Sequence, residues 1–341
     1  MSASRCVRLR VFVCSLTFSL VAYAIEPAVS PPPNSDPTYQ QLRNLSLGGE
    51  TISVNNLDLQ RDASTFHLRS GTVCFVAPVQ GRVTGAVFVG DGSMSLQPSQ
   101  ASERASLKLL TKEEEFNESF SHLVLRFTDG TYEELKKSGG TASGACDASL
   151  LHDSQNALRH GRVMKYNLDG RILEDVLGSD PGGLFVAFIH GKRYNGKELY
   201  FIDPHGAPGV APEQVELMTD DENKFGLWTA FYLGNQKAEE STLQQAVVRI
   251  EHQRLDTRIE KNANLQGKAL TTFVAMRDGI RVIPFSLFPT LRVWQTNVYQ
   301  QFPPLILRKV ESLLLGHETT VQSGEILKGK VRTLKRSGPE T

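Results

Sequence analysis

Residues Gly71–Val89 read GTVCFVAPVQGRVTGAVFV, two apolar runs on either side of Val79-Gln80-Gly81. Each run has the length and the β-branched and aromatic content of a buried strand. A glycine in so short a connection is typical of a tight turn with left-handed backbone. The stretch therefore predicts two antiparallel strands, Gly71–Pro78 and Arg82–Val89, at the centre of a β fold.

The same kind of signal continues in both directions along the chain. Strands are predicted at Thr65–Arg69, His122–Thr128, Leu184–Ile189, Leu199–Ile202, Leu227–Leu233, Gln245–Ile259, Lys268–Met276 and Arg281–Pro284. Gly90-Asp91-Gly92 is interpreted as a further turn, and Asp147–Gly161 as the best helical stretch. The predicted fold class is mainly β, with two or three β-sandwich or antiparallel-sheet modules and few short helices.

Composition shifts divide the 341 residues into successive segments. We expect a signal peptide at 1–24, a Pro-rich linker at 25–37, a β-rich module at 38–145 and a second β-rich module with a short helix at 146–240. A third β block covers 241–298. The last segment, 299–341, is predicted to hold one amphipathic helix at Leu305–Leu315 and a disordered tail from Lys328.

The N-terminus has the pattern of a secretory signal. Three arginines (Arg5, Arg8 and Arg10) precede the apolar stretch Val11–Val21, and Ala22-Tyr23-Ala24 supplies a small–x–small cleavage pattern. The apolar stretch is shorter than the roughly 20 residues that a bilayer requires. We therefore expect a secreted or periplasmic protein with no membrane-spanning segment after cleavage.

The charge balance bears on partners. With 37 basic and 37 acidic side chains, the formal net charge is zero, and no long run of one sign occurs. A nucleic-acid-binding protein usually carries a basic face, so no nucleic-acid partner is expected. A protein or peptide partner in the cell envelope fits this composition better.

Two cysteines remain if the signal is removed with Cys6 and Cys14. Cys74 and Cys146 can form one disulfide in an oxidising compartment, and the alternative is two separate thiols. Neither cysteine lies in a C-x-x-C pair, so neither is expected to bind zinc or act in catalysis.

Residues 317–321 come nearest to a catalytic motif. His317-Glu318-Thr319-Thr320-Val321 matches the zinc-peptidase pattern H-E-x-x-H except that valine replaces the second histidine. That pattern requires a helix that presents both imidazoles to the metal, and Val321 offers no ligand atom. Glu340, at the spacing of a third ligand, is the penultimate residue. We therefore predict no metal site and no catalytic residue.

Two further sets of side chains are weighed as binding residues. His190 and His205 each follow a predicted strand, where binding residues often lie, but turns also collect such residues for backbone reasons. Trp228, Phe231 and Tyr232 are candidates for an exposed aromatic groove, and ordinary sheet packing is the alternative.

The third β block carries a family resemblance. Arg254-Leu255-Asp256-Thr257-Arg258-Ile259, followed by Leu265-Gln266-Gly267-Lys268-Ala269 and Phe273, resembles the opening hairpin of the N-terminal β-domain in aminopeptidase N-like (gluzincin) zinc metallopeptidases. Arg281–Leu291 is similar to the next strand of that domain. Gly71–Gly92 and Phe201–Phe231 resemble the extension that precedes it in exported acidobacterial members. The resemblance covers roughly residues 37–298 and implies that 241–298 begins such a domain.

The resemblance stops before the catalytic part of that family. The zinc that full-length relatives bind has no ligand set here, so no site residue is carried over and no cofactor is expected. The leading interpretation is an exported, non-catalytic β-rich module. One alternative is part of a zinc aminopeptidase whose catalytic domain is missing or supplied by another chain. Another is an independent envelope-associated module that binds a peptide or glycan.

Overall fold

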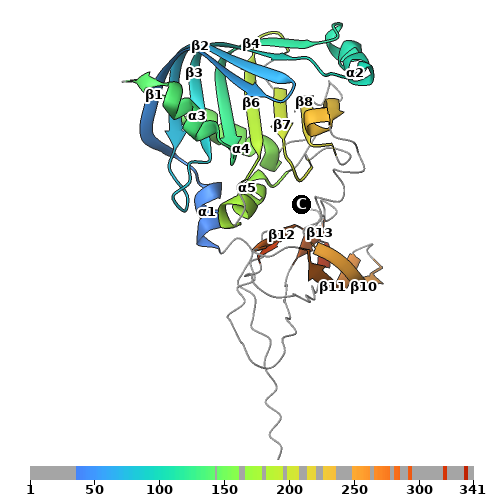
Figure 1. Cartoon of the computed structure of the whole chain (residues 1–341). Helices are drawn as coiled ribbons and strands as arrows, with labels where there is room; N and C mark the ends of the chain where they lie inside the picture. Colours follow the sequence, from blue (N-terminus) through green and yellow to red (C-terminus); the bar gives the residue numbers. More distant parts are fainter. Residues whose placement is uncertain are drawn as a thin grey trace, which may run out of the picture.

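The computed structural model describes residues 36–142, 144–160, 166–178, 182–194, 198–206, 213–219, 226–235, 248–261, 265–276, 280–284, 291–293, 318–320 and 334–336. The predicted signal peptide, nearly all of the linker and the helix predicted at Leu305–Leu315 lie outside these residues. The described part is mainly β, as predicted (Figure 1).

The largest element is one antiparallel sheet of nine strands, ordered β5-β1-β2-β3-β4-β6-β7-β8-β9. Apart from β5, each strand pairs with the next one along the chain, so the sheet is a meander. Its strands are β1 Leu47–Arg61, β2 Ser64–Val76, β3 Gly85–Leu96, β4 Phe116–Phe127, β5 Gly140–Thr141, β6 Phe185–Gly191, β7 Glu198–Ile202, β8 Val215–Thr219 and β9 Leu227–Phe231.

This sheet corrects the predicted boundary at residue 145. Strands β4 and β6 come from the two expected modules, yet they pair antiparallel from Phe120↔Gly191 to Phe127↔Phe185. The two segments therefore share one sheet and its core. The intervening helices do not separate two domains, because they pack back onto the faces of that sheet.

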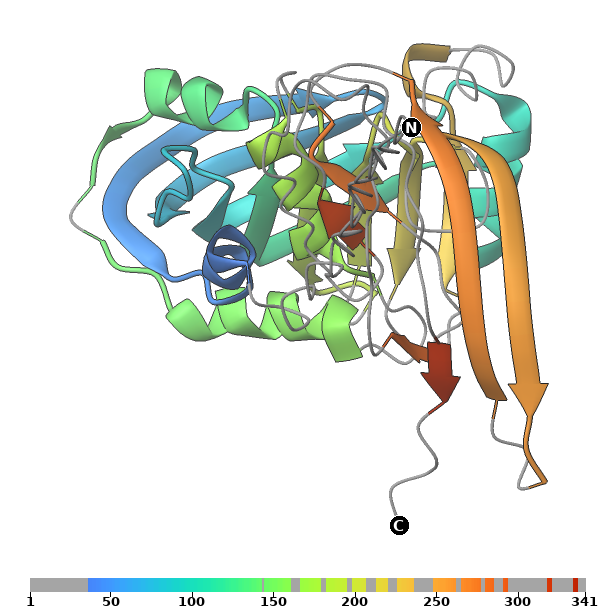
Figure 2. The same ribbon diagram turned by 90° about the horizontal axis from the view of Figure 1, so that it is seen from below.

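The sheet is strongly curled. Phe66 on β2 contacts Phe185 on β6 and Tyr200 on β7, with ring centroids 5.5 and 5.8 Å apart, although β3 and β4 lie between them in the sheet order. The Tyr200 hydroxyl also donates a hydrogen bond to the carbonyl oxygen of Arg61, at 2.9 Å. Figure 2 shows the accompanying curvature of β1 and β2. Aromatic side chains from opposite parts of the sheet thus fill its inner side.

Helices cover both faces of the sheet. They are α1 Pro37–Arg43, α2 Ala101–Thr111, α3 Thr131–Ser138, α4 Ala148–His160 and α5 Leu168–Leu177. Leucines of α2 and α3 join the inner core with Phe66, whereas α1, α4 and α5 pack on the opposite face. Strands β6 and β7 are therefore buried on both faces for most of their length, which explains their continuously apolar sequences.

The turn in the opening stretch is confirmed. The backbone amides and carbonyls of Val79 and Arg82 bond to each other at 2.9 and 3.0 Å, and Gln80 and Gly81 both have positive φ. The predicted turn at Gly90-Asp91-Gly92 is wrong, because these residues lie inside β3, where the pairing with β4 shifts. Glycine marks a bulge here instead of a chain reversal.

The rest of the described chain forms two small sheets. One has the order β10-β11-β15-β13 and the other pairs β12 with β14. Their strands are β10 Val248–Ile259, β11 Leu265–Ala275, β12 Val282–Pro284, β13 Leu291–Val293, β14 Glu318–Thr320 and β15 Leu334–Arg336. The predicted disordered tail is thus wrong for Leu334–Arg336. Val282 of β12 packs into the core beside α5 and links this part to the large sheet.

The curl at the β2–β3 pair generates a prediction. Gly90 lies opposite Gly71, and a Cβ atom on Gly90 would lie 2.2 Å from the Ser70 carbonyl oxygen. Gly90→Ala must push the two strands apart and should lower the free energy of unfolding by about 2–3 kcal/mol in urea titrations. Gly130→Ala is the control, because a Cβ there meets nothing within 4 Å. Equal effects of the two changes would contradict the assigned close approach.

Candidate functional site

A buried ionic network joins Arg171 and Asp175 of α5 to Asp203, which follows β7. The Arg171 guanidinium binds Asp203 through two hydrogen bonds of 2.8 and 2.9 Å and Asp175 through a third of 2.6 Å. Burial lowers the pKa of Arg171, but Asp203, Asp175 and Glu174 outweigh that effect and raise it above its ordinary value. The guanidinium is therefore a fixed cation that holds α5 to the loop after β7.

A second part of this network lies at the start of α5. Asp169 accepts hydrogen bonds from Arg159 of α4 at 2.6 and 3.1 Å, and its other oxygen lies 3.4 Å from Arg126 of β4. Burial is the main reason why the pKa of Arg126 falls below its ordinary value, and nearby Arg159 adds to the effect. One carboxylate therefore serves two arginines and joins α4, α5 and the sheet.

Glu118 is a third buried acid with a structural role. Its carboxylate accepts hydrogen bonds from the backbone amides of Ser119, Lys192, Arg193 and Tyr194, at 2.8–3.1 Å. The side chain is almost completely buried. Because its oxygens face the amides of the loop after β6, this carboxylate shapes that loop and does not face a substrate space.

The two strand-end histidines lie far from a common site. His190 lies near the C-terminal end of β6 and His205 follows β7. Because β6 and β7 are antiparallel, the two histidines lie at opposite ends of this strand pair. His205 lies beside Glu174, with Nδ1 3.3 Å from Oε1. His190 instead faces His122 on β4, with ring centroids 6.3 Å apart. The turn interpretation holds for His205 but is wrong for His190, which lies within β6 and pairs with His122, and the two histidines do not form a shared site.

The aromatic candidates do not form an exposed groove. Trp228 and Phe231 are buried in the inner core, where the Trp228 ring contacts Phe116 and Tyr194 at 6.0 and 5.2 Å. Tyr232 is half-buried just after β9. Sheet packing, the alternative considered for these residues, is what the structure shows for Trp228 and Phe231.

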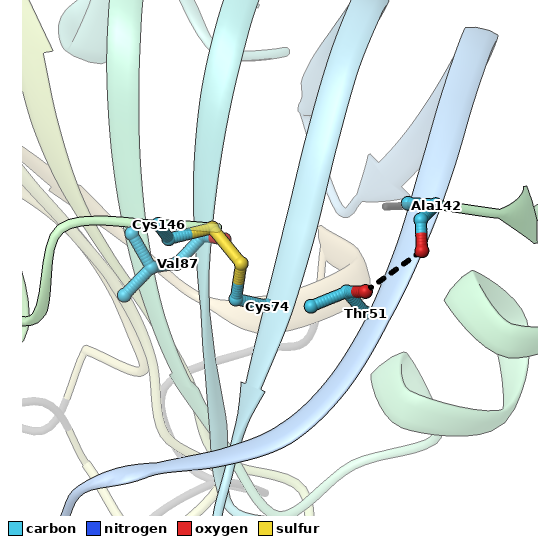
Figure 3. Close-up of a disulfide and its surroundings, with 5 residues drawn as sticks. All are labelled: Thr51, Cys74, Val87, Ala142 and Cys146. Carbon is cyan, nitrogen blue, oxygen red and sulfur yellow. Dashed lines mark hydrogen bonds between the residues drawn. A yellow bond between two sulfur atoms is a disulfide. The ribbon is translucent and has the colours of Figure 1, made fainter. Parts of the chain in front are cut away.

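Of the two alternatives for the cysteines, the structure contains the disulfide Cys74–Cys146 (Figure 3). The chain passes the β1 edge of the sheet at residues 139–142, and α3 and α4 pack on opposite faces of it (Figure 2). Within this segment Gly140–Thr141 pairs with β1, and the Thr51 hydroxyl donates to the Ala142 carbonyl oxygen at 3.3 Å. The disulfide fixes the far end of the crossing to β2.

The incomplete zinc motif does not have the geometry that it requires. Glu318–Thr320 is strand β14, which pairs antiparallel with β12 from Val282↔Thr320 to Pro284↔Glu318. H-E-x-x-H chemistry needs these positions on a helix. His317, Val321 and Glu340 lie outside the described residues. Within the described ranges, no group of three or more His, Cys, Asp or Glu side chains is arranged to hold a metal ion.

The surface that most clearly departs from this packed architecture is the β10–β11 hairpin. The two strands pair antiparallel from Val248↔Ala275 to Ile259↔Leu265. Phe273 is buried with Ile280 and Ile283 near the base. Three apolar side chains along β10 are exposed, increasingly so from the base to the tip: 56% for Ile250, 61% for Leu255 and 75% for Ile259.

The outer edge of β10 is also open. Its other edge pairs with β11, and in the part of the chain that the structure describes no strand pairs with the outer edge. Figures 1 and 2 both show β10 on the outside of the hairpin. Free backbone donors and acceptors beside exposed apolar side chains are the components of strand addition. The hairpin is therefore the candidate binding site.

Comparisons with protein-family models, with curated proteins and with solved structures find no match. A separate inspection of the described helices finds none that is both long and apolar enough to cross a membrane. The function must therefore be argued from the hairpin and from the sequence.

The disulfide generates a stability prediction. It closes a loop with a sequence separation of 72 residues. In the chain-entropy model, replacing both cysteines (Cys74→Ser with Cys146→Ser) should lower the free energy of unfolding by about 4.4 kcal/mol, measured by urea denaturation. Dithiothreitol should destabilise the wild type but leave the double variant unchanged. A wild type that is insensitive to the reductant would argue against this stabilisation.

His190 generates a pH prediction. Burial first, and then His122, lowers its pKa, while Asp153 acts in the opposite direction. The unfolded chain binds this proton below about pH 6.5, whereas the folded protein binds it only at lower pH. The free energy of unfolding should therefore fall as the pH drops below about 6.5, and less steeply in His190→Gln.

Urea titrations between about pH 7.5 and 5 measure this slope. His152→Gln is the control, because His152 is exposed on α4. Identical slopes for the wild type and His190→Gln would show that His190 does not contribute to the pH dependence.

Proposed function

We propose that the chain is an exported, non-catalytic β-rich module that acts by binding a protein through the β10–β11 hairpin. The observation that carries the proposal is the open edge of β10 beside Ile250, Leu255 and Ile259, which are all more than half exposed. Large apolar side chains exposed beside an unpaired strand edge are typical of an interaction site.

The polar and aromatic groups of the large sheet have structural roles, and this supports the hairpin as the binding surface. There the buried carboxylates of Asp169, Asp203 and Glu118 are held by arginines or backbone amides, and Trp228 is part of the core. These groups stabilise the fold. In the hairpin, by contrast, charged side chains such as Arg254 and Asp256 are exposed and bond only locally, at 3.2 Å.

Export is supported by two sequence features and one structural feature. The basic, apolar and small-residue order of residues 1–24 matches a signal, and a Pro-rich stretch follows it. The Cys74–Cys146 bond suits an oxidising compartment. We therefore place the protein outside the cytoplasm, in the periplasm or secreted.

The resemblance of Arg254–Phe273 to an aminopeptidase N-like hairpin favours a second candidate function. In this alternative the partner is a separate chain that carries the zinc aminopeptidase activity. The two candidates share the same binding surface and differ in what occupies it.

A photocrosslinking experiment tests the binding surface. A photoreactive phenylalanine analogue at position 259 should give a discrete protein adduct in cells that express the full chain. The matched control is position 109 on α2, because Leu109 and Ile259 are both 75% exposed. The proposal predicts an adduct at position 259 alone. No adduct at 259, or the same adducts at both positions, would refute the hairpin as the working surface.

The same samples identify the partner class. An adduct that contains a chain with zinc-dependent aminopeptidase activity would select the second candidate. Either way, N-terminal sequencing of exported protein should begin at Ile25 if the predicted cleavage is right.

A further inference from the structure

We infer that the occupant of the open β10 edge is a second copy of this chain, paired antiparallel through β10 about a two-fold axis at Leu255. This inference rests on the proposed function, because it names the partner of the same surface. It is argued from the register, the faces and the charges of one strand.

The first step is the face on which each β10 side chain lies. The pairing with β11 is interrupted by a shift between Ile250 and His252, so Glu251 is an extra residue. Opposite residues share a face, and Ile250, Leu255 and Ile259 are opposite Phe273, Ala269 and Leu265. Because β11 alternates without interruption over these positions, all three apolar residues lie on one face of the hairpin.

The opposite face is charged. Arg249, Arg254, Asp256 and Arg258 are opposite Val274, Leu270, Lys268 and Gln266, again in one uninterrupted alternation along β11. Without the bulge, Ile250 would fall on this charged face with them. The bulge therefore restores a common apolar stripe along a strand whose sequence alone does not alternate strictly.

The second step is the geometry of self-pairing. A two-fold axis normal to the sheet places two copies of β10 antiparallel with matching faces, and one residue then lies opposite itself. Only a register that keeps both faces matched on each side of the bulge is allowed. An axis at Leu255 meets this condition. Glu251 is the extra residue in both copies and lies at the same distance from the axis in each, so the faces match on both sides of it.

This register pairs apolar side chains on one face and opposite charges on the other. Leu255 lies opposite Leu255, and Ile250 lies opposite Ile259 on either side of the axis. On the charged face, Arg254 lies opposite Asp256, and Arg249 lies opposite Glu260, each twice. All three exposed apolar residues of β10 therefore gain an apolar partner, and four opposite-charge pairs form. One pair on the charged face is not complementary, because His252 lies opposite Arg258.

An axis at Gln253 is the nearest competing register. It also matches faces, and it sets Ile250 opposite Leu255 and Arg249 opposite Asp256. It leaves Ile259, the most exposed of the three apolar residues, without a partner among the residues that the structure describes. An axis at Arg254 sets that arginine opposite itself. An axis at Thr257 also matches faces and sets Asp256 opposite Arg258 and Arg254 opposite Glu260, but it leaves Ile250 without an apolar partner among the described residues. The pairing of all three exposed apolar residues therefore selects Leu255.

Cysteine crosslinking tests both the partner and the register. Leu255→Cys and the matched control Gln253→Cys are each made in a chain that carries Cys6→Ser and Cys14→Ser, so that the other two cysteines are the bonded pair. Directly opposite residues in an antiparallel pair lie within the Cα separation that a disulfide spans. Mild oxidation should convert the Leu255→Cys chain to a covalent dimer at least roughly tenfold faster than the Gln253→Cys chain.

Slow and equal dimer formation by the two chains would overturn the inference, and faster reaction of Gln253→Cys would overturn the Leu255 axis. Leu255→Cys also shortens a side chain, so a non-covalent measurement accompanies it. Asp256→Arg should weaken wild-type self-association in sedimentation equilibrium at least roughly tenfold, because each Arg254 then meets an arginine. Adding Arg254→Asp should restore it. A restored charge pair without restored association would refute the register.

Failure here is distinguishable from failure of the proposed function. A photocrosslinked adduct at position 259 with the mass of two chains supports the second copy. An adduct of any other mass overturns the second copy while the hairpin remains a binding surface. Absence of adducts at 259 rejects both.

Discussion

Buried charge on α5 is the constraint on which the large sheet depends. Asp169, Arg171 and Asp175 are each almost fully buried within a single helix. An isolated buried charge costs several kcal/mol, so each of these groups requires an oppositely charged partner. Asp169 and Arg171 have partners on β4, on α4 and in the loop after β7, and Asp175 pairs with Arg171 within the helix. Removing one partner leaves an uncompensated charge, which makes this the least tolerant region of the fold.

The curl of the sheet follows from the same arrangement. With α5 and α4 fixed against one face, the strands close around the aromatic side chains on the other, where Phe66 contacts Phe185 and Tyr200. Glycines at positions 71 and 90 allow the close backbone approach that this curvature requires. The result is a sheet that is packed on both faces along β6 and β7.

Strand content was the most predictable property of this chain. Apolar runs such as Leu184–Ile189 and turn residues such as Gln80-Gly81 carry their signal locally. The single sheet was not predictable from the sequence, because the pairing of β4 with β6 depends on contacts across α3, α4 and α5. Helix α5 was missed for a related reason. Its charged residues resemble a solvated segment, and only their distant partners make burial favourable.

The candidate site was only partly predictable. The alternation of β10 and β11 and their antiparallel pairing can be read from the sequence. The bulge at Glu251 cannot, and without it the apolar residues of β10 do not share a face. For Trp228 and Phe231 the sequence left two alternatives open, a groove or sheet packing, since aromatic residues near a strand end do not reveal which they line. Their burial selects sheet packing.

We propose that the open edge of β10 is the binding surface and that the nine-stranded sheet supports it. Hydrogen–deuterium exchange of the full chain, followed as a function of protein concentration, tests this proposal. Amide protection should rise with concentration in β10 alone, while β1–β9 remain unchanged. Protection of β10 that does not vary with concentration, or protection that rises in the large sheet instead, would contradict it.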